Sequence, residues 1–303
     1  MARCITFHSY KGGTGKTTIA SNLAVVLAQK GYCVALLDLD VYAPSFSSYF
    51  SYYNPKSWIN NFLEEKVSIH DILIDFSKVL NEEAQGKLYV GFSNYHKDDI
   101  YRLDININQA QTSKLKILKN FIWLREEIIA KKNADYIIID TSPGVRFWSI
   151  NALSVSDIIL LTLKSGELDF DGTKSMCEEI YWTFSKFGTT SYLLLNKVAG
   201  YCTPPSSLIN SINGNTHSES KKKGENRDKG LFLENSTLNS ESSSSSQFTD
   251  NIVNTLSEEI RMDVLSQIPC YCDIQFSHKE YLTVLKNPNH PFSRDIHNIA
   301  DKI

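Results

Sequence analysis

The 303-residue sequence has no strong excess of charge of either sign. Lys and Arg number 31 and Asp and Glu number 34, which gives a formal net charge of −3 at pH 7. This balance provides no global attraction to nucleic acid or to an anionic membrane, so binding of non-specific DNA would require a local basic patch. No apolar run is long enough to cross a bilayer, and we expect no transmembrane segment.

The few cysteines are scattered through a sequence of intracellular type, so we do not expect a disulfide framework. The six residues are spread along the chain: Cys4, Cys33, Cys177, Cys202, Cys270 and Cys272. The last two are the only close pair, and their C-x-C spacing differs from the C-x-x-C of many metal sites. No signal-peptide pattern precedes the first predicted strand, so we expect a cytoplasmic protein.

Residues 9–18, with the sequence SYKGGTGKTT, lie between a short apolar segment and a pattern of apolar residues at helical spacing that ends near Gly31. Closely spaced glycines and a helix N-terminus bring backbone N–H groups towards phosphate oxygens. Lys16 would hold the β- and γ-phosphates of a nucleotide, and the Thr17 hydroxyl would bind Mg²⁺. The predicted nucleotide-binding residues of this loop are Gly12, Gly13, Thr14, Gly15, Lys16, Thr17 and Thr18.

The strict Walker A pattern has glycine where this sequence has Tyr10. The segment KGGTGKT, which begins at Lys11, instead resembles the deviant Walker A motif of the MinD/ParA ATPases. This resemblance implies an ATP-dependent homodimer in which Lys11 reaches the nucleotide of the other subunit. The alternative is a glycine-rich turn with a solvated lysine.

Two carboxylates, Asp38 and Asp40, follow the apolar run at 33–37. In open α/β sheets ligands bind beyond the carboxyl ends of the strands, which is where these residues would lie. The resemblance implies that Asp40 orients the attacking water and that Asp38 supports either the Mg²⁺ shell or the loop. The alternative is that both acids merely end a strand.

A second apolar strand, at 136–139, ends in Asp140 and has the character of a Walker B motif. Its carboxylate would bind Mg²⁺ beside Thr17. The predicted metal-binding residues are therefore Thr17, Asp38 and Asp140.

A later strand at 192–195 ends in Asn196-Lys197-Val198-Ala199. Guanine-specific proteins carry aspartate at the last of these positions, and a methyl group cannot accept the hydrogen bonds of guanine, so ATP is favoured. By the resemblance, Asn196 contacts the adenine, as does the loop at Pro269.

The overall pattern predicts one α/β domain over residues 1–303, a doubly wound and mostly parallel sheet with helices on both faces. Further strands are expected at 88–92, 158–163 and 264–269, and helices at 58–80, 112–132, 171–187 and 248–262. The final apolar stripe, which includes Ile296 and Ile299, is expected to dock on the sheet. Between about 203 and 247 a segment rich in Ser, Asn and Lys has the composition of a disordered insertion.

The motifs together predict an ATP-driven dimerisation switch that positions or partitions a cargo. Slow hydrolysis, which uses Lys11, Lys16 and Asp40, would be stimulated by a protein partner or a surface. One alternative is an Mrp-type iron-sulfur cluster carrier, which the residues at 40–45 also resemble and for which Cys270 and Cys272 are the available thiols. The other alternative is a nucleotide-binding scaffold without turnover.

Overall fold

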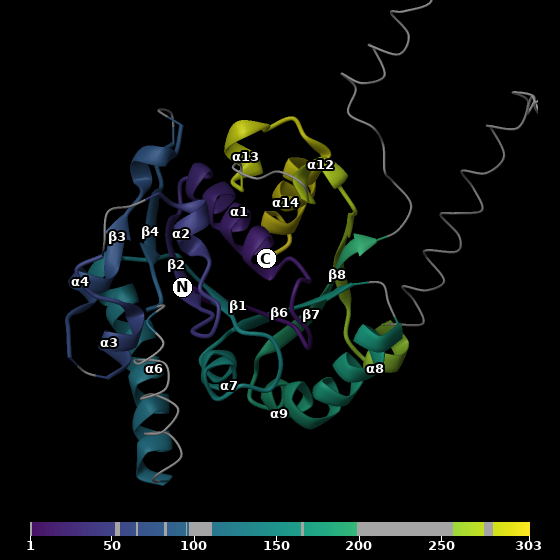
Figure 1. The fold of residues 1–303 in the computed structure, drawn as a ribbon, viewed down its shortest axis with the longest axis horizontal. Helices are drawn as coiled ribbons and strands as arrows, with labels where there is room; N and C mark the ends of the chain where they lie inside the picture. The colour runs from purple at the N-terminus through teal and green to yellow at the C-terminus, as the bar shows by residue number, and fades with distance from the viewer. Residues whose placement is uncertain are drawn as a thin grey trace, which may run out of the picture.

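The computed structural model describes residues 2–51, 55–64, 66–81, 84–94, 96, 111–164, 167–198, 257–275 and 281–303. Their centre is an eight-stranded sheet with the strand order β3-β4-β2-β5-β1-β6-β7-β8 (Figure 1). The strands are β1 (Arg3–His8), β2 (Cys33–Leu39), β3 (Leu73–Asp75), β4 (Lys87–Gly91), β5 (Tyr136–Thr141), β6 (Ile158–Lys164), β7 (Thr190–Val198) and β8 (Val264–Pro269).

Every neighbouring pair of strands is parallel except β3 and β4, which are antiparallel. The central strands are apolar and buried, and all six residues of β5 are shielded from solvent. Burial on both faces is typical of a parallel sheet covered by helices on each side. The predicted doubly wound, mostly parallel α/β fold is confirmed.

One face of the sheet is covered by α1 (Lys16–Gln29), α13 (Thr283–Lys286) and α14 (Pro291–Ala300) (Figure 1). Ile296 and Ile299 of α14 are fully buried in the same apolar cluster as the inner side of α1. The C-terminal helix therefore docks on its own sheet, as its apolar stripe predicts. The short helix α2 (Phe46–Tyr49) lies near the loop that follows β2.

The opposite face packs against a second set of helices. These are α3 (Ile59–Leu63), α4 (Ile69–Ile72), α6 (Gln111–Lys132), α7 (Phe147–Ser154), α8 (Glu167–Met176), the π-helical segment η2 (Cys177–Tyr181) and α9 (Trp182–Ser185). The helices predicted at 112–132 and 171–187 are confirmed, with a π-helical turn inside the second. No helix of the described residues combines the length and the apolarity that a membrane crossing needs.

The helical prediction for residues 58–80 is wrong in its second half. The chain forms α3 and α4 there, but Leu73–Asp75 become the edge strand β3, and Ser77–Val79 form the 3₁₀ turn η1. Pairing with β4 satisfies the backbone of these residues and overrides their weak helical periodicity. The predicted insertion at 203–247 and most of the helix at 248–262 lie outside the described residues, and the short helix α12 (Cys272–Gln275) follows β8.

Candidate functional site

The loop between β1 and α1 has the tight backbone that its glycines allow. Gly13 and Gly15 have φ angles of 73° and 93°, in the left-handed region that favours glycine. A Cβ atom on Gly15 would lie 2.2 Å from Nδ2 of Asn196. That amide donates a hydrogen bond of 2.7 Å to the carbonyl oxygen of Thr14, so the end of β7 lies directly against the loop.

Lys16 occupies the first turn of α1 and is 6% exposed. Its Nζ donates to Oγ of Ser9 at 2.8 Å, and that hydroxyl donates to the carbonyl oxygen of Lys11 at 2.6 Å. Burial lowers the pKa of Lys16, while the nearby Asp140 and Asp40 raise it. The ammonium group is therefore held over its own loop, where it faces carboxylates at the ends of two strands.

Thr17 and Asp140 form the second part of the site. The Thr17 hydroxyl donates to Oδ2 of Asp140 at 2.6 Å. Oδ1 of the same carboxylate is buried and has no hydrogen-bond partner among the described residues. Burial raises the pKa of Asp140 to about 7, against the opposing effects of Lys16 and Thr17. A hydroxyl beside a buried carboxylate oxygen without a partner is a donor set that fits a hard cation such as Mg²⁺.

Asp38 is fully buried at the end of β2 and organises the loop that follows. Its Oδ1 accepts from the backbone N–H of Asp40 at 3.1 Å. Its Oδ2 accepts from the N–H groups of Ser45 and Phe46 at 3.1 and 3.2 Å. Burial, and then the charge of Asp140, hold the pKa of Asp38 well above its usual range.

Asp40 links two loops that come from neighbouring strands. Its Oδ1 accepts from Oγ of Ser142 at 2.6 Å and from the backbone N–H of Ala43 at 3.2 Å. Ser142 follows β5, so this carboxylate joins the segment after β2 to the turn after β5. Both segments border the same cavity.

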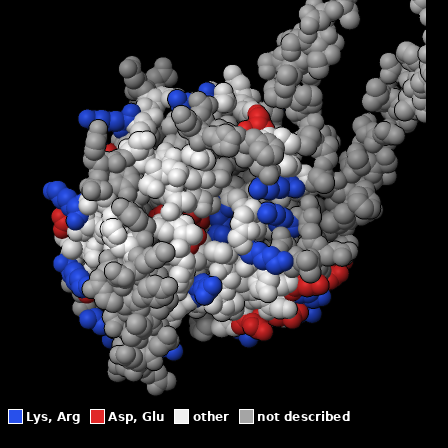
Figure 2. Space-filling view, viewed as in Figure 1, with Lys and Arg blue, Asp and Glu red and all other residues white. Residues whose placement is uncertain are grey.

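The cavity at this edge of the sheet has a volume of about 530 Å³ and receives both polar and aromatic side chains. It is lined by Gly12, Gly13, Gly15, Lys16, Thr17, Thr18, Asp40, Tyr42, Ala43, Ser45, Tyr49, Ser142, Pro143, Arg146 and Lys197. Figure 2 shows that several Lys and Arg side chains surround this region of the surface. Residues from four segments that are distant in the sequence thus lie around one space, and the predicted site residues among them are those of the phosphate loop and Asp40.

A second cavity, of about 200 Å³, shares Gly15, Thr18, Tyr49 and Lys197 with the first. Its other lining residues are Ile19, Asn196, Ile268, Pro269, Tyr271, Ile274, Tyr281 and Phe292. The predicted base-contacting residues Asn196 and Pro269 both lie here. Aromatic and aliphatic walls with one buried amide suit a flat heterocycle.

Sequence reasoning missed Tyr49, the first residue of an aromatic-rich run at 49–53 to which no motif assigns a role. Its hydroxyl lies 2.7 Å from Oγ1 of Thr18, and its ring lies 4.8 Å from that of Tyr281, centre to centre. Tyr49 thus borders both cavities. The available signal was the position of the run, a few residues after Asp40 on the ligand-binding side of the sheet.

Lys11 is exposed within the loop. Among the described residues no group of three or more His, Cys, Asp or Glu side chains is placed to hold a metal ion. Cys270 is half-buried at the end of β8 and Cys272 is exposed, and neither forms a disulfide bond.

Comparison with known proteins agrees with this geometry. A family model described as an AAA domain matches residues 2–187, more than half of the chain. The chain belongs to this AAA-domain family. The AAA-domain match contains the predicted phosphate loop and the carboxylates Asp38, Asp40 and Asp140.

Three relatives show the range of proteins to which the chain is similar. An uncharacterized protein of Methanocaldococcus jannaschii is 30% identical over 183 residues, which cover 58% of this chain and 64% of that protein. The sporulation initiation inhibitor protein Soj of Bacillus subtilis is 25% identical over 182 residues, with coverage of 59% and 65%. The iron-sulfur cluster carrier protein of Aquifex aeolicus is 48% identical over 142 residues, with coverage of 46% and 32%. The matched region thus spans less than two-thirds of each relative.

Solved structures match over nearly the whole chain. The cell division ATPase MinD of Pyrococcus furiosus has a TM-score of 0.65 at 17% identity, covering 100% of this chain and 98% of that one. The septum site-determining protein MinD of Pyrococcus horikoshii, complexed with Mg-ADP, has a TM-score of 0.64 at 16% identity, with coverage of 99% and 95%. The predicted resemblance to the MinD/ParA ATPases is confirmed, as is the P-loop nucleotidase fold.

Proposed function

We propose that this protein binds and hydrolyses ATP and that ATP drives its dimerisation. The observation that carries the proposal is the contact of Thr17 with Asp140 beside the buried Lys16, at a cavity that continues into an aromatic pocket. A phosphate chain with Mg²⁺ would occupy the first space, and adenine the second. The Mg-ADP complex of the matched Pyrococcus horikoshii protein supports this assignment.

The loop residues have separate roles in this proposal. Lys16 neutralises the β- and γ-phosphates, and the backbone N–H groups of residues 12–18 surround the phosphate oxygens. Thr17 and Asp140 hold Mg²⁺, which supplies positive charge against the phosphates when it is bound. The hydrogen bonds of Asp38 favour its role in shaping the loop over direct binding of the metal.

Asp40 positions the attacking water in this proposal. Ser142 holds one of its oxygens, and the side chain borders the larger cavity, so it has a fixed place near the phosphates. Asn196 and Pro269 contact the adenine, and Lys11 reaches the nucleotide of a second subunit in an ATP-bound homodimer.

The switch would act in the positioning or partitioning of a cargo, with a protein partner or a surface that stimulates hydrolysis. Matched proteins named for septum site determination and for inhibition of sporulation initiation support such a role. One matched structure is a complex of MinD with MinC from Aquifex aeolicus, at 16% identity and a TM-score of 0.63.

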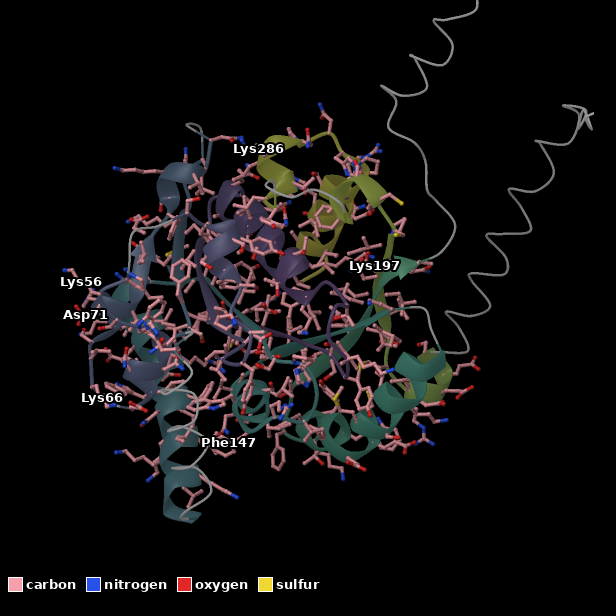
Figure 3. The ribbon with its side chains drawn as sticks, in the orientation of Figure 1. Lys56, Lys66, Asp71, Phe147, Lys197 and Lys286 are labelled. Carbon is pink, nitrogen blue, oxygen red and sulfur yellow. The ribbon has the colours of Figure 1, made fainter. Side chains whose placement is uncertain are left out.

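Two substitutions test the roles of Lys16 and Asp40. Lys16→Ala removes a charge-assisted phosphate contact worth about 1.5–3 kcal/mol, so we expect ATP affinity to fall by at least tenfold. Asp40→Ala leaves the phosphate contacts in place, so it should bind ATP with unchanged affinity and lose hydrolysis. Asp71→Ala, at the left edge of the molecule in Figure 3 and outside the lining of both cavities, is the control for Asp40→Ala. An equal loss of nucleotide binding in the Lys16 and Asp40 variants would contradict the assigned roles.

An Mrp-type iron-sulfur carrier is the second candidate. It is favoured by the 48% identity to the iron-sulfur cluster carrier protein of Aquifex aeolicus. Cys270 and Cys272 would then supply thiolates from each of two subunits, because one C-x-C pair provides only half of a four-cysteine ligand set. Anaerobic reconstitution with iron and sulfide tests this candidate. A chromophore that forms in the unchanged protein and disappears in the Cys270→Ser and Cys272→Ser variants would favour the carrier role over the positioning role. The absence of a chromophore in the unchanged protein would favour the switch.

A further inference from the structure

Two lysines, Lys164 and Lys197, lie at the ends of adjacent strands. Neither belongs to the phosphate loop or was predicted as a site residue. Lys164 is the last residue of β6, and in the parallel register it lies opposite Asn196 of β7. Lys197 is the next residue of β7 (Figure 3). Both side chains are half-buried at the edge of the sheet where the phosphate loop lies.

The ammonium group of Lys164 lies above the phosphate loop. Its Nζ is 3.3 Å from the point that a Cβ atom on Gly13 would occupy. Because Gly13 has no side chain, the lysine approaches the loop backbone at the level where phosphate oxygens would meet the N–H groups. No hydrogen bond or ion pair within the described residues involves the Lys164 ammonium group.

Lys197 is held in place by an irregular backbone. It has a φ angle of 57°, unusual for a residue other than glycine, and the register between β7 and β8 shifts between Asn196 and Val198. Its own N–H donates to Oδ1 of Asn196 at 2.9 Å. The side chain borders both the larger cavity and the aromatic pocket, which is where a ribose and its first phosphate would join the two.

The two ammonium groups repel each other. Burial, and then the charge of Lys164, lower the pKa of Lys197. Like charges in a half-buried site weaken the folded protein unless an anion lies between them. Such an arrangement is consistent with a binding site whose charge is balanced by its ligand.

We propose that Lys164 and Lys197 bind the phosphate oxygens of the nucleotide, with Lys197 at the α-phosphate and Lys164 at the β-phosphate. This inference rests on the proposed nucleotide site and adds two residues to it. Lys164 lines neither cavity and approaches the loop at Gly13, which itself lines the larger cavity, whereas Lys197 borders both spaces. The pair thus provides charge along the phosphate chain beyond that of Lys16.

The test measures binding of ADP and AMP to the full chain by calorimetry. We expect Lys164→Met to weaken ADP binding by at least tenfold and to leave AMP binding within twofold, and Lys197→Met to weaken both. Lys164→Arg should retain most of the ADP affinity because it keeps the charge. Lys286→Met is the matched control, since it removes the same charge from an exposed position in α13 (Figure 3).

Thermal unfolding separates this role from a structural one. Without nucleotide, Lys164→Met and Lys197→Met should melt at or above the temperature of the unchanged protein, because each variant removes the repulsion, and ADP should raise their melting temperatures less. The inference is overturned if the unchanged protein binds ADP and Lys164→Met binds it equally well, or if Lys164→Met weakens AMP as much as ADP. If the unchanged protein binds no adenine nucleotide, the proposed function fails as well.

Discussion

The contact between Gly15 and Asn196 gives a prediction that can be worked out in magnitude. Gly15→Ala would retain a φ angle near 93° and place its new methyl group 2.2 Å from Nδ2 of Asn196. The left-handed backbone alone costs about 1–2 kcal/mol for a residue with a Cβ atom. Displacement of the amide also leaves the carbonyl oxygen of Thr14 without its donor, which costs about 1–3 kcal/mol when buried. We expect a total loss of about 2–5 kcal/mol in the free energy of unfolding.

Gly188→Ala is the matched control. Gly188 has the same φ angle of 93°, and a Cβ atom there would meet nothing within 4 Å. This variant should therefore lose only the about 1–2 kcal/mol of backbone strain. Urea unfolding of both variants, followed by circular dichroism, isolates the cost of moving Asn196.

A double substitution tests whether the two residues act through the same contact. Because Gly15→Ala already breaks the hydrogen bond of Asn196, adding Asn196→Ala should change stability by less than about 0.5 kcal/mol. In the parent background Asn196→Ala should cost about 1–3 kcal/mol. Gly15→Ala should also weaken ADP binding by more than tenfold, since the displaced amide enters the cavities. Equal stability of Gly15→Ala and Gly188→Ala, with normal ADP binding, would refute the reasoning.

Three further predictions concern other parts of the site. Gly172→Ala should cost about 1–3 kcal/mol, because its Cβ atom would lie 2.0 Å from the Tyr10 ring, and Tyr10→Ala in the same chain should relieve most of that loss in urea unfolding. Thr17→Ala should weaken Mg²⁺-dependent ATP binding by about tenfold in calorimetry, because the hydroxyl beside Asp140 is lost. Mg²⁺-free ADP binding should be unchanged, and an equal loss of affinity in both measurements would contradict the metal assignment. Burial lowers the pKa of His8 to about 3, so its NMR signals should not titrate between pH 5 and 8. Its contribution to stability should be complete above pH 6.5 and be lost as the pH falls below that value. An NMR titration midpoint near pH 6.5 would contradict its burial.

The sequence predicted the parts of the site that depend only on which residues directly follow a strand. The phosphate loop and the carboxylates Asp38, Asp40 and Asp140 follow apolar strands directly, so their meeting at one sheet edge could be expected from the parallel fold alone. The partners of Asp38 could not be expected. Its carboxylate accepts backbone N–H groups from residues 45 and 46, a contact set by the shape of the loop.

Contacts between distant segments account for most of what was missed. The strand β3 exists because β4 offers it an edge, and no periodicity within residues 73–75 reveals that pairing. Likewise, Tyr49 meets Tyr281 across more than 200 residues of sequence, and Lys164 meets Gly13 only through the strand order. The single-domain boundary and the insertion at 203–247 stay predictions.

The most direct test of the proposed switch is the molar mass of the purified protein in solution with each nucleotide. Light scattering coupled to size exclusion should give a monomer with ADP and a dimer with ATP in the Asp40→Ala variant, which preserves the triphosphate during the measurement. Lys11→Ala in the same background should bind ADP normally and stay monomeric with ATP, because its charge acts only when two subunits enclose the phosphates. The same mass with ATP and with ADP, or an ATP dimer that survives Lys11→Ala, would contradict the account.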